Sequence, residues 1–447
     1  MRMTTFYEIL VMQDHELSQP LVKIPNTFSL QTGGPLTICH GLRSLSGQVA
    51  VDDTLDHHHV MIHELVMQEL LLKENVPYQI LCHNGQFVFG PSIGLLLGNK
   101  PGEYTPAYMA EHYSVRAGAY PLIGGTLAAF TISAINWDIR AVEGLLWNAA
   151  ENSWEPAFFP LPSVIYRRHL RQKNFRHFRN SYKKMGGILF NTNRWDKWKT
   201  HKFFLKRSIQ NMQLPATKKA VSEKIVLDML HEYKKIVLKP VSNSQGRGIL
   251  FAEKLSDFHY SLTKQENEDW TVIHFTHHED LINELQHEKI FKKRYLSQSY
   301  IDLSLVNGRP FDIRVIMQKK SGWVCSGIEC RLAGLNQDVT NLSQGGSAFH
   351  IQEMLKLINI EKPENIINQI QQISKNLAAR LDETGEHFAE LGIDLALDRD
   401  QKIWLIEINF RPGYKGFIDL DYPVYEFISR QPFLYAAEIQ GFSVQEE

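Results

Sequence analysis

Cysteine is scarce in this sequence. Its 447 residues include four cysteines, Cys39, Cys82, Cys325 and Cys330, and no two of them form a Cys-x-x-Cys pair. So few and so scattered a set excludes a disulfide-stapled framework and favours a reducing compartment. Cys325 and Cys330 fall within an apolar strand-like run, so we expect them to be core residues and not catalytic nucleophiles.

The chain also lacks an excess of either charge. It carries 48 Lys and Arg against 49 Asp and Glu, a formal net charge of -1, so the overall balance indicates neither a nucleic-acid binder nor an acidic solvating protein. Residues 163–222 are a local exception, because Asp196 is their only acidic residue. The basic run 166–184 could bind a polyanion such as nucleic acid, or it could be a solvated helix facing an anionic small-molecule site. We favour the second interpretation, because no recognised nucleic-acid motif accompanies the charge.

Targeting and membrane signals are weak. Residues 1–16 offer a short apolar run with no small-residue cleavage site, so we expect no secretory signal and a cytosolic protein. The uncharged segment 117–136 approaches the length of a membrane span. Pro121 and the Gly124–Gly125 pair make it a poor spanning helix, and we predict a turn followed by a buried strand over residues 126–135.

Length and composition suggest about three domains of ~150 residues each. Residues 1–97 read as a small, mainly β domain, in which Asn84–Gly85 between alternating apolar runs predicts a hairpin. A glycine- and proline-containing linker precedes an α/β domain over 106–200. Residues 201–440 alternate strands and helices, with apolar residues at helical spacing from Ile366 to Leu381.

The histidine run 57–59 raises the question of a transition-metal site. Three adjacent histidines cannot all face one ion in a regular element. We therefore interpret the run as a surface turn that leads into a helix.

Residues 236–250 predict a strand that ends near Lys239, a polar glycine-containing loop, and a second strand. Backbone N–H groups of such a loop can surround phosphate oxygens, and the lysine adds a point charge. The sequence GxxxxGK[ST] is absent from the chain, which excludes a Walker loop. The same composition also suits an ordinary hairpin connection, so the loop alone leaves both interpretations open.

A second group of charges lies on two neighbouring strand-like runs. In residues 309–320, Asp312 and Arg314 alternate with apolar residues, which places the acid and the guanidinium on one face. The next run ends at Arg331 and precedes the polar, glycine-bearing segment 339–349. This pattern fits a charged cleft above a core, and it also fits a structural ion pair on an exposed sheet face.

An apolar run near the C-terminal end carries Glu407 and Asn409 two residues apart, hence on one face of a strand. A hairpin that pairs Asp398 with Ile403 places Asp394 opposite Glu407. Facing carboxylates repel unless one is protonated or a cation lies between them. Oxygen ligands without histidine or thiolate suit a hard ion such as Mg²⁺.

Taken in order, these motifs resemble the ATP-grasp fold over residues ~190 to ~440: Lys239 before its loop, the run Gln298–Ile301, the Asp-x-Arg strand, and Asp394 followed by Glu407-x-Asn409. More narrowly, NTNRWDKWKTHKFF, TNLSQGG and the preceding β domain are similar to the YheC/YheD family of endospore coat-associated proteins. The resemblance implies an α/β (α+β) fold, in which an ATP-grasp module follows a small mainly β domain and an α/β pre-ATP-grasp domain.

The resemblance also implies ATP and Mg²⁺ as cofactors and a role for each matching position. Arg314, Arg331 and Arg411 would neutralise charge on the transferred phosphate, and Asp394, Glu407 and Asn409 would hold Mg²⁺. At Gln298 ATP-grasp proteins commonly have a glutamate, but the glutamine oxygen can still accept from the adenine amino group. The residues expected to bind ATP are Lys197, Lys239, Ser244, Gln245, Gly246, Gly248, Gln298, Tyr300 and Ile301.

The implied activity is ATP-dependent activation of an unidentified carboxylate to an acyl phosphate, which a nucleophile, often an amine, displaces. Positioning and electrostatics carry such a reaction, so no nucleophilic serine or cysteine is needed. The implied setting is the cytoplasm of the producing cell, with association to spore-coat proteins. The alternative is a coat-assembly protein that binds nucleotide without turnover.

Overall fold

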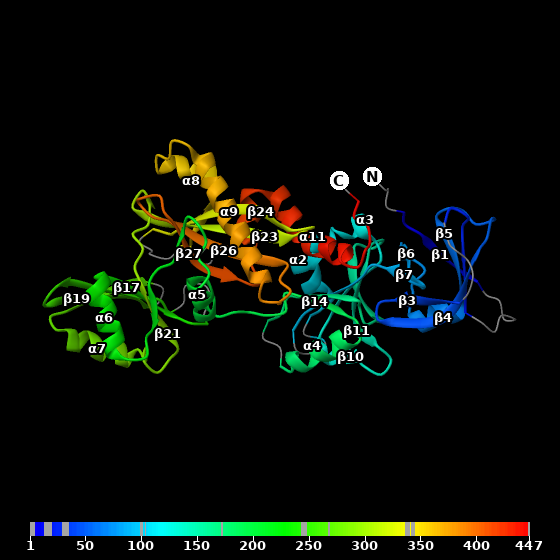
Figure 1. The fold of residues 1–447 in the computed structure, drawn as a ribbon, viewed down its shortest axis with the longest axis horizontal. Coiled ribbons are helices and arrows are strands. Elements are labelled where there is room, and N and C mark those ends of the chain that lie inside the picture. Colours follow the sequence, from blue (N-terminus) through cyan, green and yellow to red (C-terminus); the bar gives the residue numbers. More distant parts are fainter. Residues whose placement is uncertain are drawn as a thin grey trace.

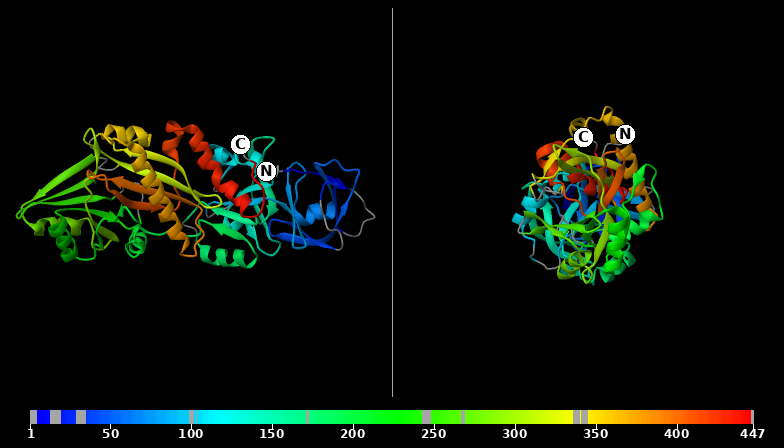
Figure 2. Two further views of the ribbon diagram at one scale, coloured as in Figure 1. Left: turned by 45° about the horizontal axis from the view of Figure 1, so that its top comes forward. Right: turned by 90° about the vertical axis from the view of Figure 1, so that its left-hand side faces the viewer.

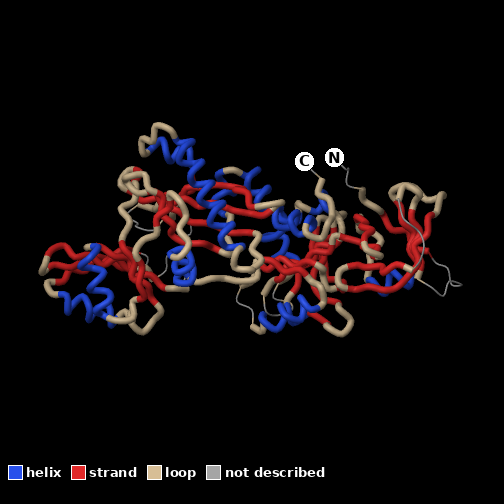
Figure 3. The backbone as a smooth tube through the Cα atoms, in the orientation of Figure 1, coloured by secondary structure: helices blue, strands red, loops and turns tan. Residues whose placement is uncertain are grey.

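The computed structural model describes residues 5–12, 20–28, 35–98, 102, 104–170, 173–242, 248–266, 269–335, 340 and 345–445. The molecule is elongated, and its four sheets follow one another along the long axis (Figure 1). The N-terminal sheet lies at one end. The sheet formed by strands of the 217–299 region lies at the other end (Figure 1), and Figure 3 shows strands along the whole length of the molecule.

The N-terminal sheet has the strand order β1-β5-β2-β4-β3-β7-β6. Its two-residue hairpin is confirmed: His83 pairs with Gln86, and Asn84 and Gly85 have φ of 49° and 74°, as a turn that follows the sheet twist requires. The histidine run 57–59 enters strand β5, and the helix expected after it begins only at Glu64. The elements are Glu8–Met12 (β1), Leu21–Ile24 (β2), Leu36–His40 (β3), Arg43–Val51 (β4), His59–His63 (β5), Glu64–Leu70 (α1), Gln79–His83 (β6) and Gln86–Gly90 (β7).

The second sheet has the order β10-β11-β9-β8-β13-β14, and β12 pairs with β11. The expected boundary at residue 97 falls after β8, but β8 pairs with β9 and β13 in this sheet. All five residues of β8 are buried, which is typical of a parallel strand covered on both faces. The strand expected over 126–135 is confirmed in its first half as β9, and a 3-10 turn interrupts it at Ile132. The elements are Ser92–Leu96 (β8), Pro106–Ala117 (α2), Tyr120–Ile123 (α3), Thr126–Phe130 (β9), Ile132–Ala134 (η1), Ile135–Asn136 (β10), Ala141–Asn148 (β11), Ser153–Pro160 (β12), Val164–Arg167 (β13), Phe175–Lys184 (α4) and Ile188–Phe190 (β14).

The third sheet has the order β15-β27-β26-β23-β24-β25, and β22 pairs with β23. The predicted helical spacing is confirmed by α9, whose apolar stripe packs with α8 on the core face of this sheet, where Cys330 is also buried. The elements are Lys197–Leu205 (α5), Met212–Gln213 (β15), Leu305–Val306 (β22), Arg309–Lys319 (β23), Trp323–Leu332 (β24), Ser347–Phe349 (β25), Ile351–Leu357 (α8), Pro363–Asp382 (α9), Glu390–Leu397 (β26), Ile403–Asn409 (β27), Lys415–Leu420 (α10) and Tyr422–Glu438 (α11).

The fourth sheet, of order β16-β21-β17-β18-β19-β20, is inserted in the sequence between α5 and β22. Helices α6 and α7 bury their apolar stripes against it. The elements are Thr217–Lys219 (β16), Glu223–Tyr233 (α6), Lys235–Pro240 (β17), Leu250–Ser256 (β18), His259–Glu266 (β19), Asp269–Phe275 (β20), His278–His287 (α7) and Tyr295–Ser299 (β21).

Helix α11 joins the third sheet to the middle of the molecule, where it lies beside α2 (Figures 1 and 2). Its residues Phe433 and Ala436 share a core with Ile93 of β8 and Leu127 of β9. Helix α11 therefore fixes the orientation of the third sheet relative to the second sheet. Over the described ranges, no helix is both long enough and apolar enough to cross a bilayer.

Candidate functional site

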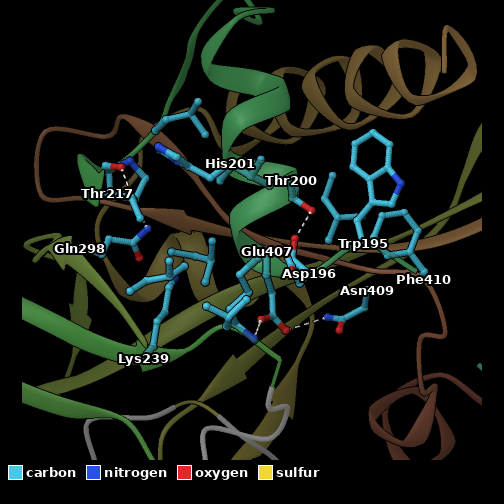
Figure 4. A pocket seen from close by; sticks show the side chains of 18 of the residues that line it. Trp195, Asp196, Thr200, His201, Thr217, Lys239, Gln298, Glu407, Asn409 and Phe410 are labelled. Carbon is cyan, nitrogen blue, oxygen red and sulfur yellow. Dashed lines mark hydrogen bonds and ion pairs between the residues drawn. The ribbon is translucent and has the colours of Figure 1, made fainter. Parts of the chain in front are cut away.

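A cleft of about 700 Å³, including its solvent-filled mouth, lies between the third and fourth sheets. Strands β17 and β21 form one wall, and α5 and β27 form the other (Figure 4). The described residues that line it are Arg194, Trp195, Asp196, Lys197, Thr200, His201, Leu214, Pro215, Thr217, Lys239, Val241, Leu296, Gln298, Leu405, Ile406, Glu407, Ile408, Asn409 and Phe410.

Lys239 is the buried cation of this cleft. Strand alternation in β17 turns Leu238 into the apolar core and Lys239 into the cleft, where the lysine is 7% exposed. Burial lowers the pKa of Lys239 to about 8, and the nearby charge of Lys197 acts in the same direction. No carboxylate lies within ion-pair distance of Lys239 in the described part of the chain, and Glu407 acts on it only from farther away. A buried ammonium in this state favours an anionic ligand.

Lys197 stands at the first position of α5. Asp196 caps this helix by accepting from the backbone N–H of Lys199 at 2.8 Å, because an aspartate before the first turn satisfies an otherwise unpaired donor. The cap directs Lys197 toward β27, where its Nζ lies 2.8 Å from Oε2 of Glu407. The sequence therefore places both lysines expected to bind nucleotide on the walls of one cleft.

Gln298 lies at the other end of the cleft, on β21. Its Nε2 donates to Oγ1 of Thr217 at 2.8 Å, so the amide oxygen of Gln298 does not take part in this bond. Tyr300 and Ile301 do not line the cleft: the Tyr300 ring lies beneath the ammonium of Lys235, 4.4 Å from the ring centre. Of the expected hinge residues, the structure brings Gln298 to the cavity wall.

The β26–β27 hairpin places Asp394 opposite Glu407, as the sequence predicted. The predicted pairing of Asp398 with Ile403 is wrong, since Ile403 pairs with Leu397. Asp398 accepts from the backbone N–H groups of Asp400 and Lys402 at 3.0 and 2.8 Å, and so it belongs to the turn. A bulge between Asp394 and Leu395 then shifts the register by one residue and restores the expected pair.

The charges of the facing carboxylates are balanced by protein cations, and an amide donates a hydrogen bond to each of them. Burial alone would raise the pKa of Asp394, but Arg314 and Arg331 outweigh burial and hold this pKa below its usual value. Lys197 does the same for Glu407. Nδ2 of Asn409 donates to Oδ2 of Asp394 at 3.1 Å and to Oε1 of Glu407 at 3.0 Å. Both acids are therefore ionised at neutral pH, and all three side chains share one face.

The predicted arginines form a network around Asp394 and Asp312. Arg314 Nη2 lies 2.9 Å from Oδ2 of Asp394, and Arg331 makes two 2.6 Å bonds to Asp312 and a 3.2 Å contact to Asp394. Glu329, on strand β24 with Arg331, is 2% exposed. Burial raises the pKa of Glu329 to about 7, although Arg314 and Arg331 act in the opposite direction. Arg314 and Arg331 are thus engaged by Asp394 and Asp312 beside the cleft, and neither these arginines nor Asp394 is among the described residues that line it.

The remaining expected positions are Arg411 and four residues of the loop after β17. Arg411 is exposed, does not line the cleft, and is close enough to Tyr108 of α2 for its charge to act on that phenol. Ser244, Gln245 and Gly246 lie outside the described residues. Gly248 has φ of +76°, and its carbonyl accepts from the Tyr295 hydroxyl at 3.0 Å at the base of the loop.

Several residues that line the cleft were not singled out from the sequence, among them Arg194, His201 and Thr217. Arg194 precedes α5 and His201 lies one turn into it, and the Asp196 cap was the signal that could have marked this helix start. Thr217 is on a three-residue edge strand and offered no comparable signal.

Known proteins match this chain in sequence and in structure. A family model described as YheC/D like ATP-grasp matches residues 186–439. Endospore coat-associated protein YheD of Bacillus subtilis (strain 168) is 26% identical over 410 residues, 87% of each chain. YheC of the same organism is 24% identical over 319 residues, 69% of this chain and 86% of that protein. D-alanyl-alanine synthetase A from Vibrio cholerae aligns over 77% of this chain and 97% of its own at 10% identity, with a TM-score of 0.45. Because the family model covers more than half of the 447 residues, the chain belongs to the YheC/D-like ATP-grasp family.

Proposed function

We propose that this protein is an ATP- and Mg²⁺-dependent carboxylate ligase that acts through an acyl phosphate. The observation that carries the proposal is the buried Lys239, which faces Lys197 and the ionised Glu407 across one cleft. Gln298 and Thr217, at the far end, offer the polar atoms an adenine needs. The names of the Bacillus subtilis relatives support an association with the endospore coat.

The donor chemistry of the hairpin fits a hard cation. Asp394 and Glu407 are ionised, and Asn409 adds an amide oxygen once its side chain turns over from the orientation in which nitrogen faces the acids. These three side chains would hold Mg²⁺, which when bound neutralises phosphate charge and aligns the transferred group. Lys197, released from Glu407, would then contact phosphate.

In the proposed reaction a carboxylate oxygen of the acid attacks the γ-phosphorus, and the bond from this phosphorus to the β–γ bridging oxygen breaks, with ADP keeping the electron pair. An amine then attacks the acyl carbon, phosphate leaves with the C–O electrons, and the amine loses a proton. Lys239 and Lys197 would hold the phosphates, and Arg314 and Arg331 would stabilise charge on the transferred group.

The test is phosphate release by the purified protein with MgATP and mixtures of candidate acids and amines. We expect release that requires both an acid and Mg²⁺. A protein that is stabilised thermally by MgATP, never turns it over and still associates with the coat would support the nucleotide-binding assembly protein instead.

Affinity for ATP should fall as pH rises through about 8, the pKa of Lys239 in the free protein. Below this pH the lysine is already charged. Above it, binding phosphate requires proton uptake, because a bound anion raises the lysine pKa. Calorimetry at pH 8 in buffers of different ionisation enthalpy should therefore detect proton uptake on binding.

Without ligand, the unfolding free energy should rise between about pH 8 and 10.5, because over this range Lys239 is protonated in the unfolded chain and deprotonated in the folded protein.

Lys239→Met should remove this proton uptake and weaken ATP binding by about ten- to a hundredfold, the effect of losing a charge-assisted hydrogen bond of about 1.5–3 kcal/mol. Lys218→Met, an exposed change on strand β16 of the same sheet, is the matched control and should leave both measurements unchanged. Equal proton uptake in wild type and Lys239→Met would contradict the assignment of Lys239 to the phosphates.

A further inference from the structure

A second hollow adjoins the nucleotide cleft, and Arg194 and Asp196 line both. It measures about 1250 Å³, open solvent included as for the cleft, and lies between the end of β13, helix α4 and the start of α5. We call it the arginine hollow. Its described lining residues are Arg167, Leu170, Phe175, Arg176, Arg179, Thr192, Asn193, Arg194, Asp196, Lys199 and Ser242, five cations against one carboxylate.

Arg167 at the base of the arginine hollow is held by several contacts. Arg167 is 5% exposed, and its guanidinium lies 3.2 Å from the centre of the Phe175 ring. It also donates to the backbone carbonyls of Thr192 and His169 at 2.8 and 3.1 Å. Burial lowers the pKa of Arg167 to about 10, and the charge of Arg179 acts in the same direction. Positive charge is therefore concentrated on a fixed surface.

Asp196 in the lining and Glu386 next to it already have partners. Asp196 lies 3.0 Å from Nη2 of Arg294 and accepts from the N–H of Lys199. Glu386 accepts from Thr192 and Asn193 at 2.8 and 2.9 Å, and Arg179 lies 3.8 Å from it. These contacts leave the hollow with a net positive charge, which suits an occupant that brings several negative charges.

The aromatic rings favour carboxylates over nucleic acid. Single-stranded nucleic acid is held by bases stacked on open aromatic faces. Here the guanidinium of Arg167 lies over Phe175, the one aromatic residue among the described lining residues. Four of the five cations on the described walls are guanidinium groups, and guanidinium groups pair with carboxylates in a bidentate manner.

We propose that the arginine hollow binds the acid substrate through carboxylates other than the one that is activated, so that the substrate is a polycarboxylate such as an acidic peptide. This inference rests on the proposed ligase function. Arg194 lies on both walls, so an occupant of the hollow lies next to the phosphate end of the cleft, marked by Lys197 and Lys239.

The test measures binding of tetraglutamate and tetraglutamine peptides by calorimetry, with Mg²⁺ and a non-hydrolysable ATP analogue present. Tetraglutamate should bind, and tetraglutamine should bind at least about tenfold more weakly. The double variant R176Q/R179Q should weaken tetraglutamate binding by about tenfold, because each lost charge pair at a half-exposed site contributes modestly. Unfolding midpoints of the variants verify that they remain folded.

The matched control is K183Q/K184Q, which removes the same charge from the same helix outside the hollow and should leave tetraglutamate affinity unchanged. Equal losses in both double variants, or equal binding of the two peptides, would overturn the proposal. So would an oligonucleotide of matched charge that binds tighter than tetraglutamate and loses its affinity in R176Q/R179Q. Thermal stabilisation by MgATP is recorded separately. Its absence counts against the nucleotide site, whereas its presence with no peptide preference counts against the arginine hollow alone.

Discussion

Replacing Glu407 with glutamine is expected to lower Mg²⁺-dependent phosphate release by about a hundredfold or more, the usual effect of removing one preorganised charge from a phosphoryl-transfer site. Glutamine keeps the size of the side chain and its place opposite Asp394, so the hairpin should persist. The substitution removes one of the two carboxylates on the shared face and releases Lys197, whose Nζ lies 2.8 Å from Oε2 of Glu407. Turnover should fall because the cation loses a ligand, while the unfolding midpoint should change little.

Glu364→Gln provides the control, since Glu364 is exposed in the first turn of α9 and distant from the cleft lining. It should release phosphate at the wild-type rate. Asp394→Asn should resemble Glu407→Gln, because it removes the facing carboxylate. If Glu407→Gln releases phosphate as fast as wild type at saturating Mg²⁺, the assignment of this face to the cation is wrong.

The sequence predicted the acidic face because strand alternation depends on neighbouring residues alone. Glu407 and Asn409 share a face whatever the rest of the chain does. The position of Asp394 depended on the hairpin register, and here the prediction succeeded through a compensation. Asp398 turned into the loop to satisfy two backbone N–H groups, and the bulge restored the pairing with Glu407. Turn hydrogen bonds and bulges arise from three-dimensional backbone geometry, and residue type specifies them only weakly.

Contacts between distant segments were harder to anticipate. Arg411 follows Asn409 by two residues, yet the chain bends after β27 and leaves Arg411 near Tyr108 of α2. Strand β8 read as the end of the first domain, since a buried parallel strand has no alternation to show which sheet contains it. Thr217 meets Gln298 across 81 positions of sequence. Such pairings depend on tertiary packing, for which the local pattern carries no signal.

A buried ion pair joins the second sheet to the third sheet. Arg168, which follows β13, donates to Oε2 of Glu390 on β26 at 3.1 Å and to the carbonyl of Pro412 at 3.1 Å. The Tyr166 hydroxyl donates to the same carboxylate, and Nε2 of Gln318 donates to it at 3.2 Å. Glu390 is 0% exposed, so the surrounding protein replaces water around this charge.

Glu390→Gln is therefore expected to lower the unfolding free energy by about 3–5 kcal/mol, because it leaves Arg168 buried without its carboxylate. The penalty is increased by Arg116, a second buried arginine close enough for its charge to act on Arg168. Urea denaturation followed by tryptophan fluorescence should show the loss as a lower midpoint. The double variant Arg168→Met/Glu390→Met should be less destabilised than Glu390→Gln, since it removes both charges and fills the space with apolar atoms. Glu426→Gln breaks the 3.4 Å pair with Arg430 on helix α11, a pair whose side chains are 38% and 22% exposed, and should cost at most about 1 kcal/mol. Equal midpoints for Glu390→Gln and Glu426→Gln would mean that water reaches Arg168. The second and third sheets would then be held together by α11 and the shared apolar core, and not by this ion pair.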